Sequence, residues 1–482
     1  MKHLSLLLLL GAVCAPAAMA EGYQVNSLSA KQIGMGHTGV ALKLGAESMF
    51  FNPAGMAYMD RKVDLSAAVT AILPSVTATI DGAQYKTAAG VSTPININAA
   101  FSIYRNLKAG IAFYTPYGSS IDWTDNWPGA VLNQNVNLKV FTIQPTLAWA
   151  ITDRLSIGAG AMISWGSVDL NKGLVSASTA DKALGLLAQI DPSLQGVPPF
   201  GMTTPAQVHL SGKAAPAVGF NVGALYSILP KDRLSVGVSF RSRTWAKVKS
   251  GDAYVNYATP VAEAVLSESL NMLNEANFTA RMPAPWVLSF GVSSKPIDKL
   301  TLAFDARLTG WHTYRELNIR FLSEQLTPYN QQIAKDYRDS WCLSLGAEYA
   351  LTRRLDLRLG LMVDTTPVNS DNYNPETPGM TKVEPTCGLS FRPIPGLSID
   401  LAFMYVAGLG ADNVSCTYDD LLGKMLPGKI AGALQGMGLP ADQAAARAEA
   451  MAQQAGLSPT ATLRGSYALH AFTPALGISY SF

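Results

Sequence analysis

Apolar and polar residues alternate along most of the chain beyond residue 60. In the stretch 355–361 the four leucines occupy the odd positions, and Asp356, Arg358 and Gly360 lie between them. A period of two is that of a β-strand with one apolar face. The pattern predicts fourteen strands, near 61–72, 94–104, 108–117, 137–150, 154–166, 213–228, 232–246, 284–294, 299–312, 339–350, 354–364, 382–393, 396–407 and 464–482.

Short turns and long connections alternate between these strands. Six short turns have related sequences, at 105–107, 152–157, 231–236, 297–302, 352–357 and 395–397. The other connections have about 17 to 58 residues, so all the long ones leave one end of the sheet. This asymmetry is typical of an outer-membrane barrel, which has short periplasmic turns and long extracellular loops. A secreted β-sandwich is the alternative, and it leaves the asymmetry unexplained.

The composition also favours a membrane barrel. Of the 482 residues, 48% are hydrophobic and 15% are charged, whereas soluble domains carry about 25% charged residues. No apolar run of about 18 residues follows the first twenty, so no spanning helix is expected. A closed sheet leaves no backbone group unpaired in hydrocarbon, and fourteen strands enclose a lumen that water or a plug must fill. The formal net charge of +2 gives no sign of a nucleic-acid partner.

The first residues predict export. Lys2 precedes an apolar run at 4–13, and Ala18-Met19-Ala20 is typical of a signal-peptide cleavage site before Glu21. An uncleaved anchor, or a lipoprotein signal ending at Cys14, would be alternatives. We therefore expect a signal peptide at 1–20 and a mature protein in the outer membrane of a Gram-negative bacterium.

Aromatic residues and the C-terminus fit that location. The tryptophans expected at the long-loop ends of strands predict an interfacial aromatic girdle; they are Trp165, Trp245, Trp286, Trp311 and Trp341. The last residues alternate down to Phe482, which resembles the signal read by the outer-membrane assembly machinery.

Residues 21–60 do not alternate and are rich in Gly and Ala. They would suit a hatch that plugs the lumen of a barrel formed by 61–482. Within them, Gly34, Gly36 and Gly39 spell GxGxxG. A dinucleotide site would need a preceding strand and a following helix, whereas close backbone packing needs only the glycines.

The segment Phe50-Phe51-Asn52-Pro53-Ala54-Gly55-Met56 resembles the FadL family of outer-membrane transporters for hydrophobic compounds, also called the toluene-transporter family. The resemblance continues through 114–118, 125–129, 282–286 to Asp305 and Trp311, and 337–340 to 364–367. It implies a 14-stranded antiparallel barrel plugged by an N-terminal hatch. It also implies that loops capture a hydrophobic ligand, that the hatch rearranges, and that the ligand leaves sideways into the membrane.

Seven residues are carried over from this resemblance. Asn52, Pro53, Ala54 and Gly55 would form the hatch motif, and Pro116, Tyr117 and Gly118 would lie at a kink in the third strand beside a lateral opening. An ordinary turn at Asn52-Pro53 and a strand end at Pro116 are the alternatives. Loops 167–212 and 247–283 differ from the family, so no ligand-binding residue is assigned. Segments 261–274 and 441–454 within the loops are expected to be helical.

Enzyme chemistry finds little support. His37, His209, His312 and His470 are scattered, and Cys342, Cys387 and Cys416 show no disulfide or metal-ligand spacing, so isolated thiols and no cofactor are expected. The expected function is uptake of long-chain fatty acids or aromatic hydrocarbons. An outer-membrane receptor for haemin, or an adhesin or structural barrel, is the alternative. The expected partners are a hydrophobic small molecule, outer-membrane lipid and the assembly machinery, and the chain is expected to be a monomer.

Overall fold

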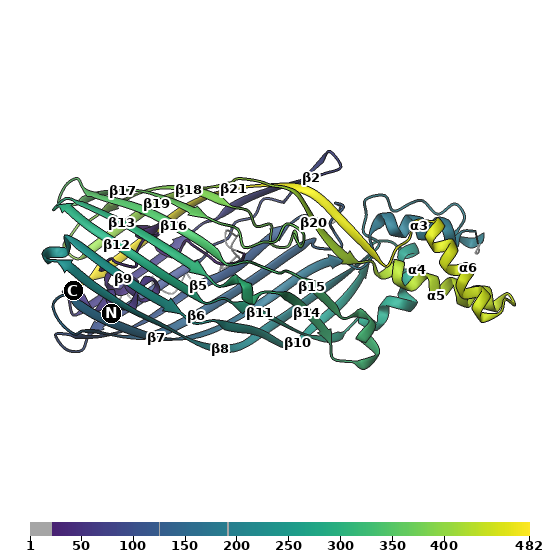
Figure 1. Cartoon of the computed structure of the whole chain (residues 1–482), viewed down its shortest axis with the longest axis horizontal. Helices are drawn as coiled ribbons and strands as arrows, with labels where there is room; N and C mark the ends of the chain where they lie inside the picture. The colour runs from purple at the N-terminus through teal and green to yellow at the C-terminus, as the bar shows by residue number, and fades with distance from the viewer. Residues whose placement is uncertain (1–21, 125, 190–191) are drawn as a thin grey trace, which may run out of the picture.

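A computed structural model describes residues 22–124, 126–189 and 192–482. The signal peptide expected at 1–20 lies outside these residues. One sheet contains every strand, and the longer helices gather beyond one end of it (Figure 1). The strands are β1 (Val63–Thr70), β2 (Leu73–Ile80), β3 (Ala83–Lys86), β4 (Ile95–Ser102), β5 (Leu107–Asp122), β6 (Asn135–Ala150), β7 (Leu155–Gly173), β8 (Ala206–Leu229), β9 (Leu234–Arg241), β10 (Thr244–Tyr257), β11 (Ala276–Ala284), β12 (Val287–Ile297), β13 (Leu300–Thr309), β14 (Glu316–Phe321), β15 (Gln331–Ala334), β16 (Ser340–Ala350), β17 (Leu355–Asp364), β18 (Lys382–Phe391), β19 (Leu397–Gly408), β20 (Ala411–Asp419) and β21 (Thr460–Ser481).

Helical segments lie before the first strand and in the long connections. They are α1 (Ala30–Ile33), η1 (Gly45–Glu47), α2 (Ser48–Phe51), η2 (Pro53–Tyr58), α3 (Ala177–Leu187), η3 (Pro192–Leu194), η4 (Pro230–Asp232), α4 (Pro260–Leu270), η5 (Asn271–Leu273), η6 (Trp311–Thr313), η7 (Glu324–Tyr329), α5 (Leu421–Gly436) and α6 (Ala441–Gln454). Within the described residues, no helix is both long and apolar enough to cross a membrane.

Fourteen antiparallel strands close into a barrel. Neighbours pair in the order β1, β4, β5, β6, β7, β8, β9, β12, β13, β16, β17, β18, β19 and β21. Pairing of β1 with β21, from Asp64 opposite Ser481 to Thr70 opposite Ala475, completes the ring. The predicted fourteen-stranded barrel is confirmed.

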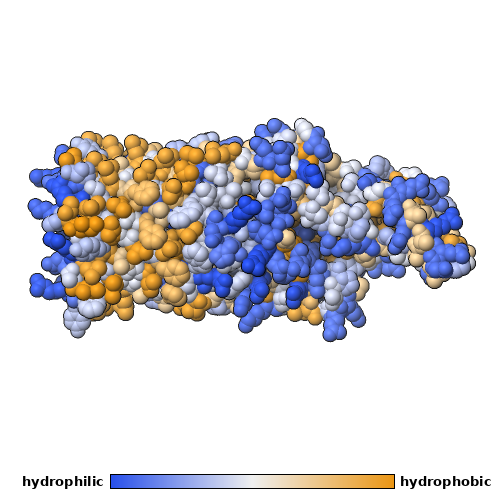
Figure 2. Space-filling view, viewed as in Figure 1, coloured by the Kyte–Doolittle hydropathy of each residue, from blue (hydrophilic) through white to orange (hydrophobic). Residues whose placement is uncertain are grey.

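The polarity of the two faces of the wall is the reverse of that in a soluble protein, with polar side chains inside and apolar side chains outside. On β17, Arg358 is 3% exposed and faces the lumen, whereas Leu359 next to it is 66% exposed on the outside. On the face drawn in Figure 2, the outward apolar residues form a band across one part of the barrel. Such a band matches the hydrocarbon layer of a membrane, which requires apolar side chains outside and permits polar ones in the lumen.

Short turns and long loops lie at opposite ends, as predicted. The six short turns join β4 to β5, β6 to β7, β8 to β9, β12 to β13, β16 to β17 and β18 to β19. The C-terminus lies at the short-turn end, and α3 to α6 lie beyond the other end (Figure 1). The helices expected at 261–274 and 441–454 are confirmed as α4 with η5 and as α6. Helices α3 and α5 were not predicted.

Several predicted strand limits are wrong at the long-loop end. The expected loops 167–212 and 247–283 are partly strand, because β7, β8, β10 and β11 continue into them. Strand β10 pairs with both β8 and β11 there, which satisfies the backbone groups of the extension. Val208, Leu210 and Phe278 are buried on its inner face. The wall therefore continues beyond the apolar band and encloses an apolar vestibule.

Candidate functional site

The segment from residue 22 to 60, here called the N-terminal segment, lies inside the short-turn half of the barrel (Figure 1). Its apolar side chains are buried, and Ile33, Met49 and Met56 have no exposed surface. Helix α1 touches β18, β19 and β21, whereas η2 touches β6, β7 and β8. The segment thus contacts the wall on different sides of the lumen.

Asn52 ties this segment to itself and to the wall. Its Nδ2 donates to the Val40 carbonyl at 2.7 Å and to the Ala224 carbonyl of β8 at 3.0 Å. Its Oδ1 accepts from the Ala54 N–H at 3.1 Å and caps η2, whose first residue is Pro53. The Ser156 hydroxyl of β7 donates to the Ala54 carbonyl at 2.9 Å. Asn52 is fully buried. Its hydrogen bonds connect the Val40 carbonyl, strand β8 and the start of η2.

Glycines let the segment and the wall approach closely. A Cβ on Gly223 of β8 would lie 2.1 Å from the Asn52 Oδ1, and one on Gly360 of β17 would lie 2.0 Å from the Gly36 nitrogen. Gly36 has a positive φ of 61° and its N–H donates to the Thr386 Oγ1 at 3.0 Å. A Cβ on Gly55 would lie 2.7 Å from the Leu42 carbonyl oxygen. In the GxGxxG stretch, Gly34 and Gly36 therefore pack against backbone, whereas Gly39 packs against the Phe51 side chain.

Pro116, Tyr117 and Gly118 lie inside β5, where its register against β6 shifts between Tyr114 and Tyr117. The strand end expected near 117 is wrong, because β5 continues to Asp122. Pairing with β4 stops at Tyr114 opposite Asn96. Beyond that point the Val25 N–H donates to the Pro116 carbonyl, and the Gly118 N–H donates to the Tyr23 carbonyl, both at 2.9 Å. Residues 23–25, here called the arm, therefore occupy the β5 edge that β4 leaves free.

An aromatic cluster covers the arm. The Tyr23 ring lies 4.9 Å from Trp311, 5.9 Å from Tyr314 and 5.9 Å from Tyr117, centroid to centroid. The Tyr23 hydroxyl donates to the Pro283 carbonyl. The prediction that Trp311 belongs to the interfacial girdle is wrong, because it is fully buried in this cluster. The chain turns inward after β13, and η6 places Trp311 over the arm.

Three cavities lead from the loops to the arm. The outer cavity, of about 200 Å³, lies among residues such as Lys172, Leu273, Phe321 and Tyr329. It shares Leu210 and Ile319 with a middle cavity of about 50 Å³, whose lining is almost wholly apolar. The middle cavity shares five residues with an inner cavity of about 20 Å³; they are Leu138, Val140, Ala214, Ala246 and Met282.

The inner cavity ends at the arm, since Tyr23 and Tyr117 line it. The cavities therefore lie in series between the long loops and the kink in β5. Of the lining residues, only Tyr117 was predicted to lie beside the ligand's exit, whereas Trp165 was expected in the aromatic girdle. Period-two alternation across 206–210 and 276–280 would have shown that Val208, Leu210 and Phe278 face inward.

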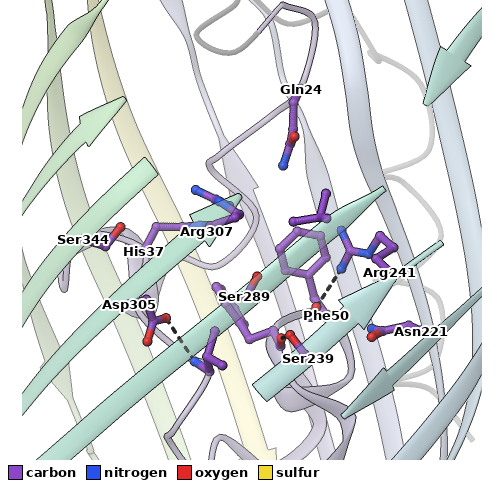
Figure 3. A pocket seen from close by; sticks show the side chains of 13 residues that line it. Gln24, His37, Phe50, Asn221, Ser239, Arg241, Ser289, Asp305, Arg307 and Ser344 are labelled. Atoms are coloured by element: carbon purple, nitrogen blue, oxygen red, sulfur yellow. Dashed lines mark hydrogen bonds between the residues drawn. The ribbon is translucent and has the colours of Figure 1, made fainter. Parts of the chain in front are cut away.

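Below the arm the lumen becomes polar. Gln24, His37, Arg241, Asp305 and Arg307 surround a cavity of about 30 Å³ (Figure 3), which is room for about two water molecules. The Asp305 carboxylate accepts from the N–H groups of Gly39 at 2.6 Å and Val40 at 3.0 Å, and the Arg241 guanidinium donates to the Phe50 carbonyl at 2.6 Å. The wall thus holds the N-terminal segment through its backbone.

The histidines and cysteines lie apart from one another. Burial, with Arg307 and Arg241 nearby, holds the pKa of His37 well below its usual value, so the ring is neutral. His209 pairs with Asp169 at 2.9 Å, and His312 pairs with Asp339 at 2.7 Å. Cys342, Cys387 and Cys416 form no disulfide within the described part of the chain. Among the described residues, no three potential metal ligands are grouped.

Docking of the N-terminal segment is expected to depend on pH through Glu47. Its Oε2 accepts from the Ser29 hydroxyl at 2.8 Å, and burial raises its pKa from 4.5 to about 7. Protonation of Glu47 therefore stabilises the docked state, and this stabilisation declines as the pH rises from 4.5 to about 7. Glu47→Gln should match the native protein in hydrogen-exchange protection of Ala30–Ile33 at about pH 5 and exceed it at about pH 8.

Glu263→Gln changes a glutamate on the loop helix α4 and serves as the control. Equal protection of the native protein and Glu47→Gln at the higher pH would contradict this role of Glu47.

A barrel with outward apolar side chains, a filled lower lumen and an apolar route from its loops is the architecture of a membrane transport protein. The family model described as outer membrane protein transport protein (OMPP1/FadL/TodX) matches residues 11–443. The chain therefore belongs to this family of outer-membrane transport proteins.

Individual proteins that are similar to this chain support the same family assignment. The long-chain fatty acid transport protein of Salmonella typhi is 20% identical over 412 residues, covering 82% of this chain and 90% of the relative. The crystal structure of a Pseudomonas aeruginosa FadL homologue has a TM-score of 0.73 at 19% identity, covering 96% of this chain and 100% of that chain. The Pseudomonas putida toluene transporter TodX has a TM-score of 0.63 at 15% identity, covering 96% and 100%. These two structures share the fold.

Proposed function

We propose that this protein takes up hydrophobic compounds from outside the cell and releases them sideways into the outer membrane at the kink of β5. The observation that carries this proposal is the series of three cavities, which begins among the long loops and ends at Tyr23 and Tyr117. A long-chain fatty acid or an aromatic hydrocarbon is the proposed cargo, by analogy with the named relatives.

The apolar lining provides the driving force for capture. Each square ångström of apolar surface that leaves water contributes roughly 25 cal/mol. The middle cavity extends between Val140, Leu170, Val248 and Phe278, so a ligand moving inward stays out of water. The polar cavity below the arm is lined by charged and polar groups such as Arg241, Asp305 and Arg307, so it offers no comparable site for an apolar molecule.

The arm is the proposed gate. Two backbone hydrogen bonds and the Tyr23 ring hold it at the edge of β5. The body of the N-terminal segment is held more strongly, through Asn52, Asp305 and Arg241. A ligand that reaches the inner cavity competes with Tyr23 for the same space. Displacement of the arm would then uncover the β5 edge to lipid, while the rest of the hatch stays in place.

The test compares ligands that co-purify with the native protein and with the double variant Asn52→Ala, Pro53→Ala. The variant leaves the Val40 and Ala224 carbonyls without their donor, and each buried group left unpaired costs about 1–3 kcal/mol. A loosened hatch should change the amount of retained fatty acid or hydrocarbon, measured by mass spectrometry after extraction from native outer membranes.

The control is Asn106→Ala, Pro395→Ala, which makes the same chemical changes at exposed turn positions. It should retain ligand like the native protein. A barrel that stays empty after soaking with fatty acids and hydrocarbons, with or without the hatch substitutions, would contradict the proposed transport. A retained porphyrin would favour a haemin receptor instead.

A further inference from the structure

The outer wall carries a belt of basic side chains on the strands β6 to β14, just beyond the apolar band. Its members are the strand residues Lys139, Lys213, Lys247, Arg281 and Arg320, and Arg243 in the short connection between β9 and β10. Strongly hydrophilic residues are visible next to the apolar band in this part of the wall (Figure 2). None of the six forms a salt bridge with another described residue. The six side chains are exposed or half-exposed on the outer face of the wall, and Lys139 and Arg281 also border the middle cavity.

The belt follows the aromatic girdle strand by strand. On β6, Lys139 comes two positions after Phe141 toward the long loops, and on β10, Lys247 comes two positions after Trp245. On β8, Val218 is 74% exposed on the outside, and Lys213 follows toward the loops. Phe113, Phe141 and Trp165 lie 5.9 to 6.2 Å apart on the outer face. Aromatic girdles mark the level of the lipid headgroups, so the belt lies at or just beyond that level.

The register places like charges next to each other. Lys247 lies directly opposite Arg281, and Arg320 lies opposite Thr279, two positions from Arg281. Lys139 and Lys213 both lie opposite Ser167 of β7 and flank it. Like charges directly opposite one another destabilise a sheet. Two carboxylates lie beside the belt on this face: the oxygens of Glu316 on β14 accept from the side chains of Asn318 and Gln332, and Asp169 on β7 pairs with His209. The belt therefore retains an excess of positive charge.

An aromatic ring holds two of the guanidinium groups in place. Arg243 and Arg281 lie over the Trp245 ring at 5.3 and 5.0 Å. On the outer face of β21, His470, Ala468 and Ser466 follow Phe472 and carry no fixed positive charge, and the next outward residue with one is Arg464, closer to the strand's outer end. The charge is thus concentrated on one wall, and it begins beside the kink, where Lys139 pairs with Gly118.

We propose that this belt docks a phosphorylated headgroup of a lipid in the outer leaflet. Arg and Lys are the side chains that bind phosphate best, through charge-assisted hydrogen bonds. Clusters of basic residues beside a membrane-spanning segment are typical of anionic-lipid recognition. A bound phosphate would relieve the repulsion between Lys247 and Arg281 and would fix lipid next to the β5 edge. Binding of a phosphorylated headgroup at the belt is independent of which compound the barrel transports.

The test uses the full-length mature protein in mild detergent, with diphosphorylated lipid A as the probe and native mass spectrometry as the readout. The belt variant is Lys213→Gln, Lys247→Gln, Arg281→Gln, Arg320→Gln. The matched control is Arg105→Gln, Arg154→Gln, Arg353→Gln, Arg354→Gln, which removes as many exposed positive charges from the short-turn end. Circular dichroism verifies that both variants are folded barrels.

The belt variant should bind lipid A about tenfold more weakly or worse, because each basic residue near an anionic headgroup contributes appreciably. The control should bind it as the native protein does. Dephosphorylated lipid A should bind the native protein as weakly as lipid A binds the belt variant. Equal binding by the belt variant and the native protein, or equal losses in both variants, would overturn the proposal. Displacement of lipid A by an equal concentration of inorganic phosphate would also overturn it, in favour of a small-anion site.

Discussion

A disulfide between Gln24→Cys and Tyr117→Cys is expected to reduce uptake of a hydrophobic probe to the level of cells that lack the protein. The two residues form an isolated antiparallel bridge. The hydrogen bonds that flank it, from the Val25 N–H to the Pro116 carbonyl and from the Gly118 N–H to the Tyr23 carbonyl, make it a non-hydrogen-bonded pair. Such pairs have Cα atoms about 4.5 Å apart, a separation that a disulfide spans. The crosslink would hold the arm on the edge of β5 and keep the exit closed.

Adding a reductant should restore uptake, which separates the crosslink from the substitutions themselves. The control pair is Ala67→Cys and Ile97→Cys, which lie opposite each other in the fixed wall between β1 and β4. Its oxidation should leave uptake unchanged. The native thiols Cys342, Cys387 and Cys416 are replaced with serine in every protein compared. Normal uptake by the oxidised Gln24→Cys, Tyr117→Cys protein would show that the ligand leaves by a route that does not require the arm to move.

The barrel could be predicted from the sequence because the membrane imposes its pattern on each strand separately. The stretch 355–361 alternates since Leu357, Leu359 and Leu361 face outward and Asp356 and Arg358 face the lumen. The strand extensions were harder to predict, because the wall beyond the apolar band has no hydrocarbon layer outside it. There the outer face carries Lys247 and Arg281, and the inner face is the apolar one. The pattern is inverted, and it resembles that of a soluble domain.

The site was predictable only in part. Asn52 and Pro116 stand in short motifs that resemble a family, so they could be located without knowing their contacts. Tyr23 stands in a segment without periodicity, and its importance arises from Trp311 and Tyr314, which lie far away in the sequence. Trp311 could not be distinguished from a girdle tryptophan, because the turn at Gly310 that redirects the chain inward follows an ordinary alternating strand.

Gly360→Val is expected to loosen the N-terminal segment and open a water-filled path through the barrel. Gly360 faces the lumen from β17, opposite Gly346 of β16. A Cβ on Gly360 would lie 2.0 Å from the Gly36 nitrogen, and one on Gly346 would lie 2.3 Å from the Met35 carbonyl oxygen. The new Cβ would clash with backbone atoms of Met35 and Gly36, so no change of side-chain rotamer can relieve the clash. Valine must therefore push the segment off the wall and break the hydrogen bond from the Gly36 N–H to Thr386.

A lumen of fourteen strands is too wide for wall side chains alone to fill, so moving the segment should admit ions. Single-channel conductance in planar bilayers should rise several-fold for Gly360→Val. Gly90→Val provides the control, because a Cβ there meets no atom within 4 Å, and its conductance should equal that of the native protein. An unchanged conductance in folded Gly360→Val would mean that the wall yields instead of the segment. A rise would show that close backbone contact between the N-terminal segment and β17 keeps the lumen closed.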